Sequence, residues 1–384
     1  MLRFPLAILV VFVHSFGAGI DVAQLHGNGF SGSAIYDYVR IFFSLVIARS
    51  AVPIFFIISG YLFFCKVATY NKEVYLGKLK KRWQSLVIPY LIWNLLFIIW
   101  TLTFIVGSIL LHGKSWNVIG EYFIQHGFLH MLWNSSVWEE RTTWFGVITH
   151  NSGPVLLPFW YMRDLIMMVV LSPVFYWLIK NLRFLFILLM MAVYIFDIRV
   201  SWMSGSFMTA GLFFNMGAYF AIMKQDFTDV LWKWRYIICP IAMILMVTQT
   251  YIGSTMDDSA SWMICHWLVI VQSFALIIFA SVMCRHRRIY ELSKRLASTS
   301  FFIYAFHVFI LGHVISLINK MMPLGDVWYV QIVCYFVSPL ICVCLCVCFY
   351  CLLRTLCPSF FAILIGERGK KKLRPYNDSS LQYQ

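Results

Sequence analysis

Charged residues are scarce in this 384-residue chain, at 12% of the sequence, whereas a typical globular protein has roughly 25%. Acidic residues are the scarcer kind, with 16 Asp and Glu against 30 Lys and Arg, and 61% of the residues are apolar. So few charges exclude an ordinary soluble domain, and the apolar content excludes a disordered chain. We therefore expect most of the surface to face lipid.

Ten apolar runs are candidates for crossing a bilayer, whose hydrocarbon core of about 30 Å requires about 20 helical residues. They predict an all-α, polytopic membrane protein with about ten transmembrane helices. We expect residues 1–358 to form the transmembrane domain and residues 359–384 to form a basic cytoplasmic tail. The ten runs are 2–20, 41–64, 86–111, 156–179, 183–198, 206–223, 235–252, 262–284, 297–318 and 328–353.

Lys and Arg fall almost wholly in every second connection between these runs. By the positive-inside rule, this alternation places both termini in the cytoplasm of a multi-pass protein of the cell inner (cytoplasmic) membrane. Topology then accounts for the net charge of +14, and we expect no nucleic-acid partner. The basic connections hold Lys66, Lys72, Lys78, Lys80, Lys81 and Arg82; Lys180 and Arg183; Lys224, Lys233 and Arg235; Arg285, Arg287, Arg288, Lys294 and Arg295; and, in the tail, Arg368, Lys370, Lys371, Lys372 and Arg374.

The first run also has features of a cleaved signal peptide, because Arg3 precedes an apolar stretch that ends in small residues. A histidine, His14, is unusual in the core of a signal peptide, and no clear small-x-small cleavage site precedes a soluble domain. We therefore expect this run to be retained as a transmembrane helix.

Neither the cysteines nor the histidines form a metal-binding pattern. Seven of the eleven cysteines lie in or near the last run, but a spacing of two residues scatters side chains around a helix. His126 and His130 are four residues apart without an HExxH pattern. We expect no metal and no disulfide framework.

The longest connection, about 112–155, is predicted to contain an interfacial helix around 117–132. One interpretation of its aromatic residues is a belt at the membrane surface. The other is a platform on which sugar rings stack, with Glu139 and Glu140 accepting hydrogen bonds from hydroxyl groups. The tryptophans concerned are Trp116, Trp133, Trp138 and Trp144.

Ionisable side chains inside the apolar runs give the functional signal, because a charge at the bilayer centre costs about 3 kcal/mol or more. Satisfying them together requires a shared polar cavity. One interpretation of Arg163 and Asp164 is that they neutralise one another. Adjacent helical residues point about 100° apart, so we expect each to meet a different partner instead. The residues concerned are His14, Arg49, Arg163, Asp164, Tyr304 and His307.

Five motifs in this order resemble the acyltransferase 3 family of integral-membrane acyltransferases. They are R-x10-H, VPIFFIISGY, PYLIWN preceded by basic residues, PFWYMRDL and SFFIYAFH, and they extend over about residues 2–350. The resemblance implies transfer of an acyl group, commonly acetyl, from cytoplasmic acyl-coenzyme A to a hydroxyl group of a cell-surface or lipid-linked glycan. It also implies that His14 is the essential histidine, paired with Arg3. The chain shows no GDS-like block of an SGNH domain, so it resembles the stand-alone type.

Acyl transfer to an alcohol needs a base, an oxyanion donor and a hold on coenzyme A. We assign His14 as general base, because imidazole titrates near neutrality. Arg49, Arg163, Ser59 and Tyr61 are alternative donors to the oxyanion or to the acceptor, and the coenzyme A phosphates are expected to meet cytoplasmic cations. The predicted catalytic residues are His14, Arg3, Arg49 and Arg163. The predicted substrate-binding residues are Ser59, Tyr61, Trp160, Asp164, Tyr304 and His307, and the residues for the acyl-CoA co-substrate are Lys78, Lys81 and Arg82.

A helix of 1.5 Å rise per residue puts Arg3 and His14 about 16 Å apart, a distance that an extended pantetheine arm spans. The alternative function is a transporter or exporter of a glycan or lipid-linked sugar, which also needs charged groups at mid-depth and broken helices such as the one around Arg49 and Pro53. The absence of an internal repeat disfavours it. Helices that are apolar all round predict no oligomeric state.

Overall fold

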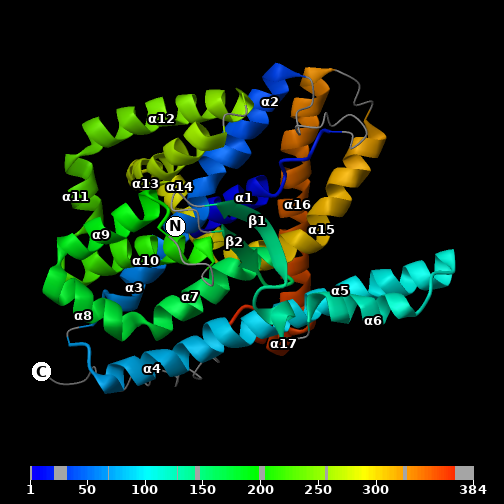
Figure 1. The fold of residues 1–384 in the computed structure, drawn as a ribbon, viewed down its shortest axis with the longest axis horizontal. Helices are drawn as coiled ribbons and strands as arrows, with labels where there is room; N and C mark the ends of the chain where they lie inside the picture. Colours follow the sequence, from blue (N-terminus) through cyan, green and yellow to red (C-terminus); the bar gives the residue numbers. More distant parts are fainter. Residues whose placement is uncertain are drawn as a thin grey trace, which may run out of the picture.

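The computed structural model describes residues 2–20, 33–67, 69–127, 129–142, 148–198, 204–255, 258–322 and 327–367. These residues are mostly helical, as predicted, with one β-hairpin (Figure 1). The elements are α1 (Arg3–Val13), α2 (Ala34–Arg40), α3 (Ala51–Phe64), α4 (Lys72–Arg82), α5 (Ile88–His112), α6 (Asn117–His126), β1 (Ser136–Thr142), β2 (Ile148–Gly153), α7 (Trp160–Val170), α8 (Ser172–Leu182), α9 (Phe184–Ile195), α10 (Gly205–Ile222), α11 (Phe227–Lys233), α12 (Arg235–Thr255), α13 (Asp258–Met283), α14 (Arg287–Leu296), α15 (Ser300–Met321), α16 (Trp328–Leu356) and α17 (Pro358–Leu364).

Six helices among the described residues are long and apolar enough to cross a membrane, or eight if each of two bent helix pairs counts as one span. Each of the ten predicted runs coincides with one of these helices, with part of a bent pair or with a shorter apolar helix. The first and fifth runs correspond to α1 and α9, which have 11 and 12 residues and are shorter than the roughly 20 that a perpendicular span requires. The protein is therefore a multi-pass membrane protein, and the count of ten stays a prediction.

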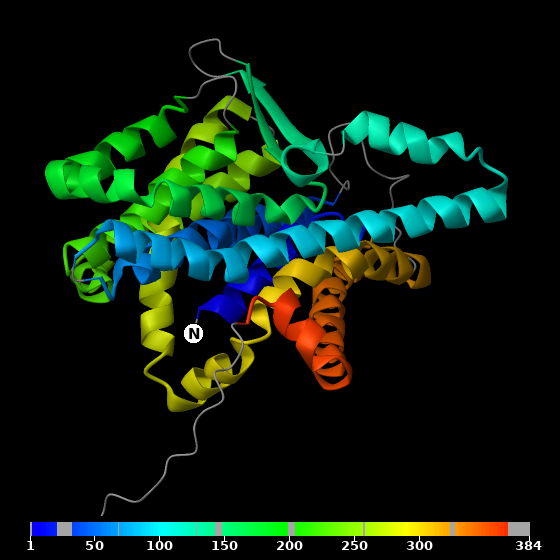
Figure 2. The same cartoon turned by 90° about the horizontal axis from the view of Figure 1, so that it is seen from below.

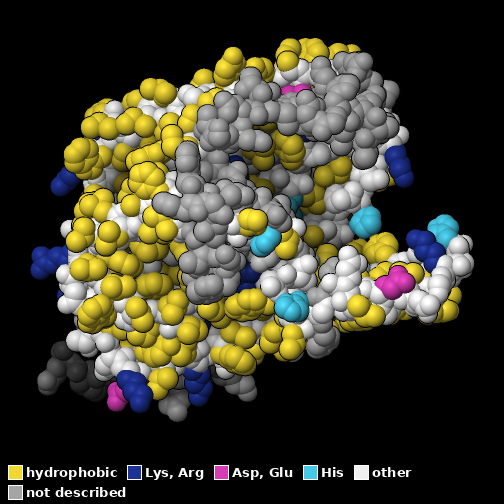
Figure 3. Space-filling model, viewed as in Figure 1, with side chains coloured by type: hydrophobic (Ala, Val, Ile, Leu, Met, Phe, Trp, Pro, Cys, Tyr) yellow, Lys and Arg dark blue, Asp and Glu magenta, His cyan; other side chains and the backbone are white. Residues whose placement is uncertain are grey.

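The surface agrees with a lipid environment. Figure 3 shows hydrophobic side chains over most of the visible face, with Lys and Arg side chains gathered toward its edges. Large apolar side chains of α12 that would be buried in a soluble protein are exposed, among them Ile237, Ile244 and Val247. Such a face is stable only where the surrounding medium is itself apolar.

Two glycines bring the central helices α3 and α10 together, in the most extensive helix pair of the described structure (Figure 1). A Cβ atom on Gly60 would overlap the carbonyl oxygen of Phe214, and one on Gly217 would overlap that of Ile57. Small residues permit this close approach, and membrane helices associate through van der Waals packing of this kind. The crossing fixes α3 and α10, which both contribute to the cavity described below.

Two irregularities in the helices coincide with prolines, at Pro53 and Pro173. Pro53 has no N–H for the carbonyl group of Arg49, four residues earlier, and its ring crowds that carbonyl. The chain before α3 accordingly runs through a π-helical segment, Ile41–Ile47, and a 3₁₀ turn, Ala48–Ser50. At Pro173 the axes of α7 and α8 diverge by 64°. The first break places Arg49 where the backbone is irregular.

Helices α4 and α5 continue one another from Lys72 to His112, and α6 runs back beside the projecting end of α5 (Figure 2). The helix predicted around 117–132 is present as α6 but ends earlier, at His126. Strands β1 and β2 are an antiparallel hairpin with an irregularity between Val137 and Glu139. The sequence interpretation missed this hairpin.

Part of the proposed sugar platform lies outside the described residues. Trp144 is not described, and neither are the side chains of Trp138, Glu139 and Glu140. The segment after residue 358 begins with the packed helix α17, in which Phe361 and Leu364 are buried. Trp93 of the PYLIWN motif donates its indole N–H to the carbonyl oxygen of Leu364 at 3.0 Å.

The glycine crossing makes a direct prediction about stability. Gly60→Ala forces α3 and α10 apart, and overpacking of this kind costs about 2 kcal/mol. We expect a clearly lower apparent Tm in detergent and a lower yield of monodisperse protein. Gly107→Ala is the matched control, because a Cβ atom at Gly107 meets no atom within 4 Å. Equal Tm values for the two variants would contradict the packing described here.

Candidate active site

A cavity of about 360 Å³ lies inside the bundle, between α1, α3, α7, α10 and α13. Apolar side chains of α1 and α3 form part of its wall, and polar groups point into it. Four predicted site residues line it, namely His14, Arg49, Trp160 and Tyr304. Of the six ionisable residues expected to share a cavity, three line it, namely His14, Arg49 and Tyr304. Further lining residues are Asn151, Tyr194, Ser206, Thr209, Cys265 and His266.

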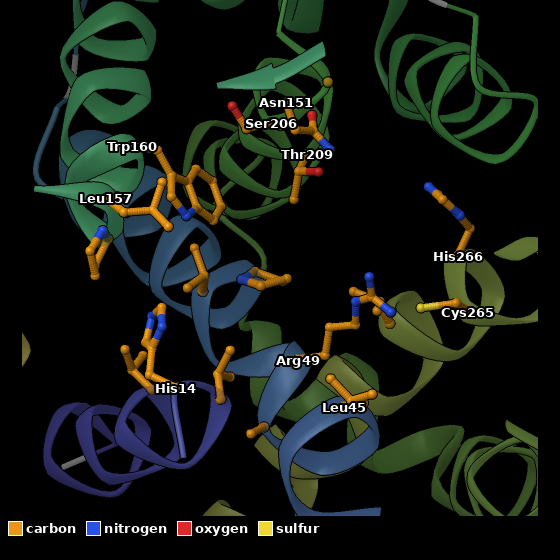
Figure 4. Close-up of a pocket in the computed structure, with 18 of the residues that line it drawn as sticks. His14, Leu45, Arg49, Asn151, Leu157, Trp160, Ser206, Thr209, Cys265 and His266 are labelled. Carbon is orange, nitrogen blue, oxygen red and sulfur yellow. The ribbon is translucent and has the colours of Figure 1, made fainter. Parts of the chain in front are cut away.

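His14 follows the last residue of α1 and faces this cavity (Figure 4). Protein surrounds the His14 side chain, but its ring remains accessible because it opens onto the cavity. The hydroxyl of Ser44, on the π-helical segment, donates to the carbonyl oxygen of Phe12 at 2.6 Å. This contact fixes the end of α1 and with it the position of the imidazole.

A second histidine, His307 of α15, lies directly behind His14. The two ring centroids are 5.3 Å apart, and the ring planes are inclined by 39°. His307 is fully buried, and its Nδ1 lies 3.1 Å from the carbonyl oxygen of Ile303. His307 therefore supports His14 from the side away from the cavity and does not line the cavity itself.

Arg49 enters the cavity from the irregular segment before α3. Figure 4 shows His14 and Trp160 toward one side of the cavity and Cys265 and His266 of α13 on the other, with Arg49 between them. The Arg49 side chain is exposed, so a guanidinium group is accessible within the cavity. His266 packs against Tyr194, with ring centroids 4.5 Å apart.

Arg163 and Asp164, expected to meet different partners, instead form a buried ion pair. Arg163 Nε lies 2.8 Å from Asp164 Oδ1, because the long arginine side chain folds back over the neighbouring residue. Both also meet Ser206, which accepts from Arg163 Nη2 at 3.0 Å and donates to Asp164 Oδ2 at 2.6 Å. The prediction of separate partners was wrong.

The rest of the Arg163 guanidinium fixes the segment before α7. Its Nη1 donates to the carbonyl oxygens of Trp133 and Ser152, each at 2.9 Å. With these bonds and those to Asp164 and Ser206, most of its N–H groups are already used. In the described structure Arg163 thus shapes the cavity through Ser206, and it is not itself among the lining residues.

Aromatic hydroxyl groups lie along the side of the cavity toward α3. Tyr304 donates to the carbonyl oxygen of Pro158 and stacks on Phe159, with ring planes 7° apart. Tyr161 packs edge-on against Tyr304, and its hydroxyl lies 3.1 Å from Ser59 Oγ. Ser59 is therefore joined to the site through Tyr161. Tyr61 lies beside the glycine crossing, next to Gly217, and does not line the described part of the cavity.

Two of the predicted cations, Lys78 and Arg82, share one aromatic ring. Lys78 donates to the carbonyl oxygen of Phe63, and its Nζ lies 4.6 Å from the centre of that ring. Arg82 lies over the same ring at 5.9 Å. Arg3 is the first residue of α1. Lys81 is exposed on α4 beside Lys78. Lys78 and Arg82 thus lie together on the Phe63 ring, and none of these cations is among the residues that line the cavity.

Sequence interpretation missed several cavity residues. His266 lies inside the predicted run 262–284, so the rule that selected His14 and His307 would also have selected it. Ser206, Thr209 and Asn151 gave no such signal, because small polar residues are tolerated in membrane helices and loops. Among the described residues, no group of three or more His, Cys, Asp or Glu side chains is arranged to hold a metal ion.

The fold and the site define a helical membrane protein with an accessible imidazole in a cavity between its helices. Residues 1–353 match the family model described as an acyltransferase domain, that of the acyltransferase 3 family, and the chain belongs to this family. It is therefore a membrane acyltransferase. The chain is similar to the succinoglycan biosynthesis protein ExoH of Rhizobium meliloti (strain 1021), with 25% identity over 347 residues, 88% of this chain and 84% of that protein. No solved structure matches it.

The buried pair predicts that Asp164→Asn is strongly destabilising. The substitution leaves the Arg163 guanidinium without its counter-charge, and breaking a buried pair costs about 3–5 kcal/mol. We expect a large fall in apparent Tm together with loss of activity. Asp229→Asn, an exposed position in the first turn of α11, is the matched control. An Asp164→Asn variant as stable as that control would contradict the role of this pair.

Proposed function

We propose that the protein transfers a short acyl group, acetyl in the simplest case, from acyl-coenzyme A to a hydroxyl group of a cell-surface or lipid-linked glycan. The observation that carries the proposal is the accessible His14 imidazole inside the cavity, at the opposite end of α1 from Arg3. The name of the similar ExoH protein, which refers to the biosynthesis of a polysaccharide, supports a glycan acceptor. We propose the inner membrane as its location.

The donor is proposed to bind along the path from the cations to the cavity. Phosphate groups of coenzyme A would meet Arg3, Lys78 and Arg82, because charge-assisted contacts to phosphate are strong. The pantetheine arm would then pass Tyr161 and Tyr304. The length of α1 from Arg3 to His14, about 16 Å, suits an extended arm. The thioester would thus reach the cavity while the nucleotide stays at the entrance.

The proposed chemistry uses His14 as general base. A ring nitrogen takes the proton of the acceptor hydroxyl as its oxygen attacks the thioester carbonyl carbon. Arg49 donates hydrogen bonds to the resulting oxyanion or to the acceptor. The carbon–sulfur bond then breaks, and the thiolate of coenzyme A takes the proton from the imidazolium. The products are the ester and free coenzyme A, and the imidazole returns to its starting state.

The acceptor is proposed to occupy the part of the cavity beyond His14. A volume of about 360 Å³ is near the lower end of the 300–1,000 Å³ typical of ligand pockets, so one sugar unit and a short acyl group fill it. Thr209 offers a hydroxyl group to the sugar, and Trp160 offers an aromatic face. Trp160 and Tyr304 accordingly remain our candidates for acceptor binding.

Substitution of His14 tests the proposed base. Positioned proton transfer contributes about 10²–10⁴ in rate, so His14→Ala should lower kcat for transfer of labelled acetyl to glycan by that factor. The assay uses purified protein in lipid vesicles with acetyl-coenzyme A and cell-surface glycan extract. His286→Ala, at an exposed histidine before α14, is the control and should retain the wild-type rate. Normal transfer by His14→Ala would refute the assignment.

The donor entrance predicts a different kinetic effect. Arg82→Ala removes a cation from the phosphate end of the donor but leaves the reacting atoms untouched. We expect the KM for acyl-coenzyme A to rise about tenfold with kcat nearly unchanged. Lys72→Ala, at the exposed first residue of α4, should change neither constant. A fall in kcat with an unchanged KM would place the donor elsewhere.

A further inference from the structure

The hydrogen-bonding state of His307 follows from its surroundings. Its Nδ1 lies 3.1 Å from the carbonyl oxygen of Ile303. A carbonyl oxygen only accepts hydrogen bonds, so Nδ1 carries the hydrogen in this contact. In the neutral ring, Nε2 then holds a lone pair and is an acceptor. This assignment of the His307 tautomer rests on the contact with Ile303 alone and does not involve His14.

This acceptor is left unsatisfied within the described structure. His307 is fully buried, and its Nε2 has no hydrogen-bond partner among the described residues. Most buried polar side-chain atoms in proteins are paired, and an unpaired one costs free energy. The sequence nevertheless places a histidine here, on a helix where an apolar residue would pack without that cost.

The neighbour that is suited to satisfy it is His14. The two ring centroids are 5.3 Å apart, and no hydrogen bond joins His307 Nε2 to the His14 ring. Hydrogen bonds between catalytic groups are often long in unliganded enzymes and shorten in the complex with substrate. A modest rotation of the accessible His14 ring would bring one of its nitrogens toward His307 Nε2 and leave the other facing the cavity.

We infer that His307 is a positioning residue that accepts a hydrogen bond from His14 and thereby holds the second His14 nitrogen, unprotonated, toward the acceptor hydroxyl. The inference rests on the proposed function of His14 as base. His307 keeps its own hydrogen on Nδ1 and remains neutral. It never receives the substrate proton.

The proton inventory is complete without any further group. His14 takes the hydroxyl proton on its cavity-facing nitrogen and becomes an imidazolium. The N–H that it already held stays on His14 and points at the lone pair of His307, which stabilises the positive charge. The imidazolium then returns the substrate proton to the thiolate of coenzyme A. The other titratable or charged groups that line this cavity are Arg49, Tyr194, Tyr304, Cys265 and His266.

Two substitutions of similar length separate positioning from packing. His307→Gln puts an amide oxygen near the place of Nε2 and keeps an acceptor, whereas His307→Met fills the space without one. We expect His307→Met to lower kcat about 10- to 100-fold, the range for a hydrogen bond to a charged group, with KM values and Tm nearly unchanged. His307→Gln should recover most of the rate. A Met variant with wild-type kcat, or Gln and Met variants that lose kcat equally, would overturn the inference.

A readout without turnover keeps the inference apart from the proposed function. In protein labelled with ¹⁵N-histidine and reconstituted in nanodiscs, the His14 signals are assigned as those missing from His14→Ala. We expect one neutral tautomer in the wild type with a bound acyl-coenzyme A, and a mixture of both in His307→Met. Identical tautomer populations in the two proteins would refute the role of His307, even where no acyl transfer is detected. Absence of transfer with the expected tautomer shift would instead count against the proposed function alone.

Discussion

The buried ion pair between Arg163 and Asp164 is the interaction on which the cavity depends. Neither charge reaches lipid, because each satisfies the other and both bind Ser206 on α10. The same guanidinium group binds the carbonyl oxygens of Trp133 and Ser152 before α7. One arginine thus joins three parts of the chain that are far apart in sequence. With α10 held against α3 by the glycine crossing, the space between them and α1 stays open.

The cost of burying charge in a membrane explains which features the sequence could predict. His14, Arg49 and Tyr304 stood out because an isolated ionisable group in an apolar run needs a polar environment, and all three line the cavity. Sequence spacing could not reveal the Arg163–Asp164 pair, because the reach of a long side chain exceeds the 100° step between helical neighbours. The hairpin after α6 is short and lies in a connection whose tryptophans suggested a belt at the membrane surface or a platform for sugar rings. The predicted apolar runs coincide with helices because the hydrophobicity of a segment is enough to identify it as a membrane helix.

Two chemically different regions follow from this arrangement. Arg3 begins α1, and Lys78 and Arg82 lie together on the Phe63 ring, so these cations suit a polyanion. His14, at the other end of α1, and the small polar residues of the cavity suit a hydroxyl-bearing acceptor. Helix α1 is the shared element, and its length sets the separation between them. The proposed donor matches this separation, because a coenzyme A thioester is a polyanion at one end and a reactive carbonyl at the other.

The most direct test of this account is a cryo-electron microscopy structure of the protein in lipid nanodiscs with a non-hydrolysable thioether analogue of acetyl-coenzyme A. We expect the phosphates beside Arg3, Lys78 and Arg82, the pantetheine arm past Tyr161 and Tyr304, and the acyl end within hydrogen-bonding distance of His14 or Arg49. Density for the acyl end outside the cavity, or for the nucleotide away from these cations, would contradict the claim that one internal cavity brings the two substrates together.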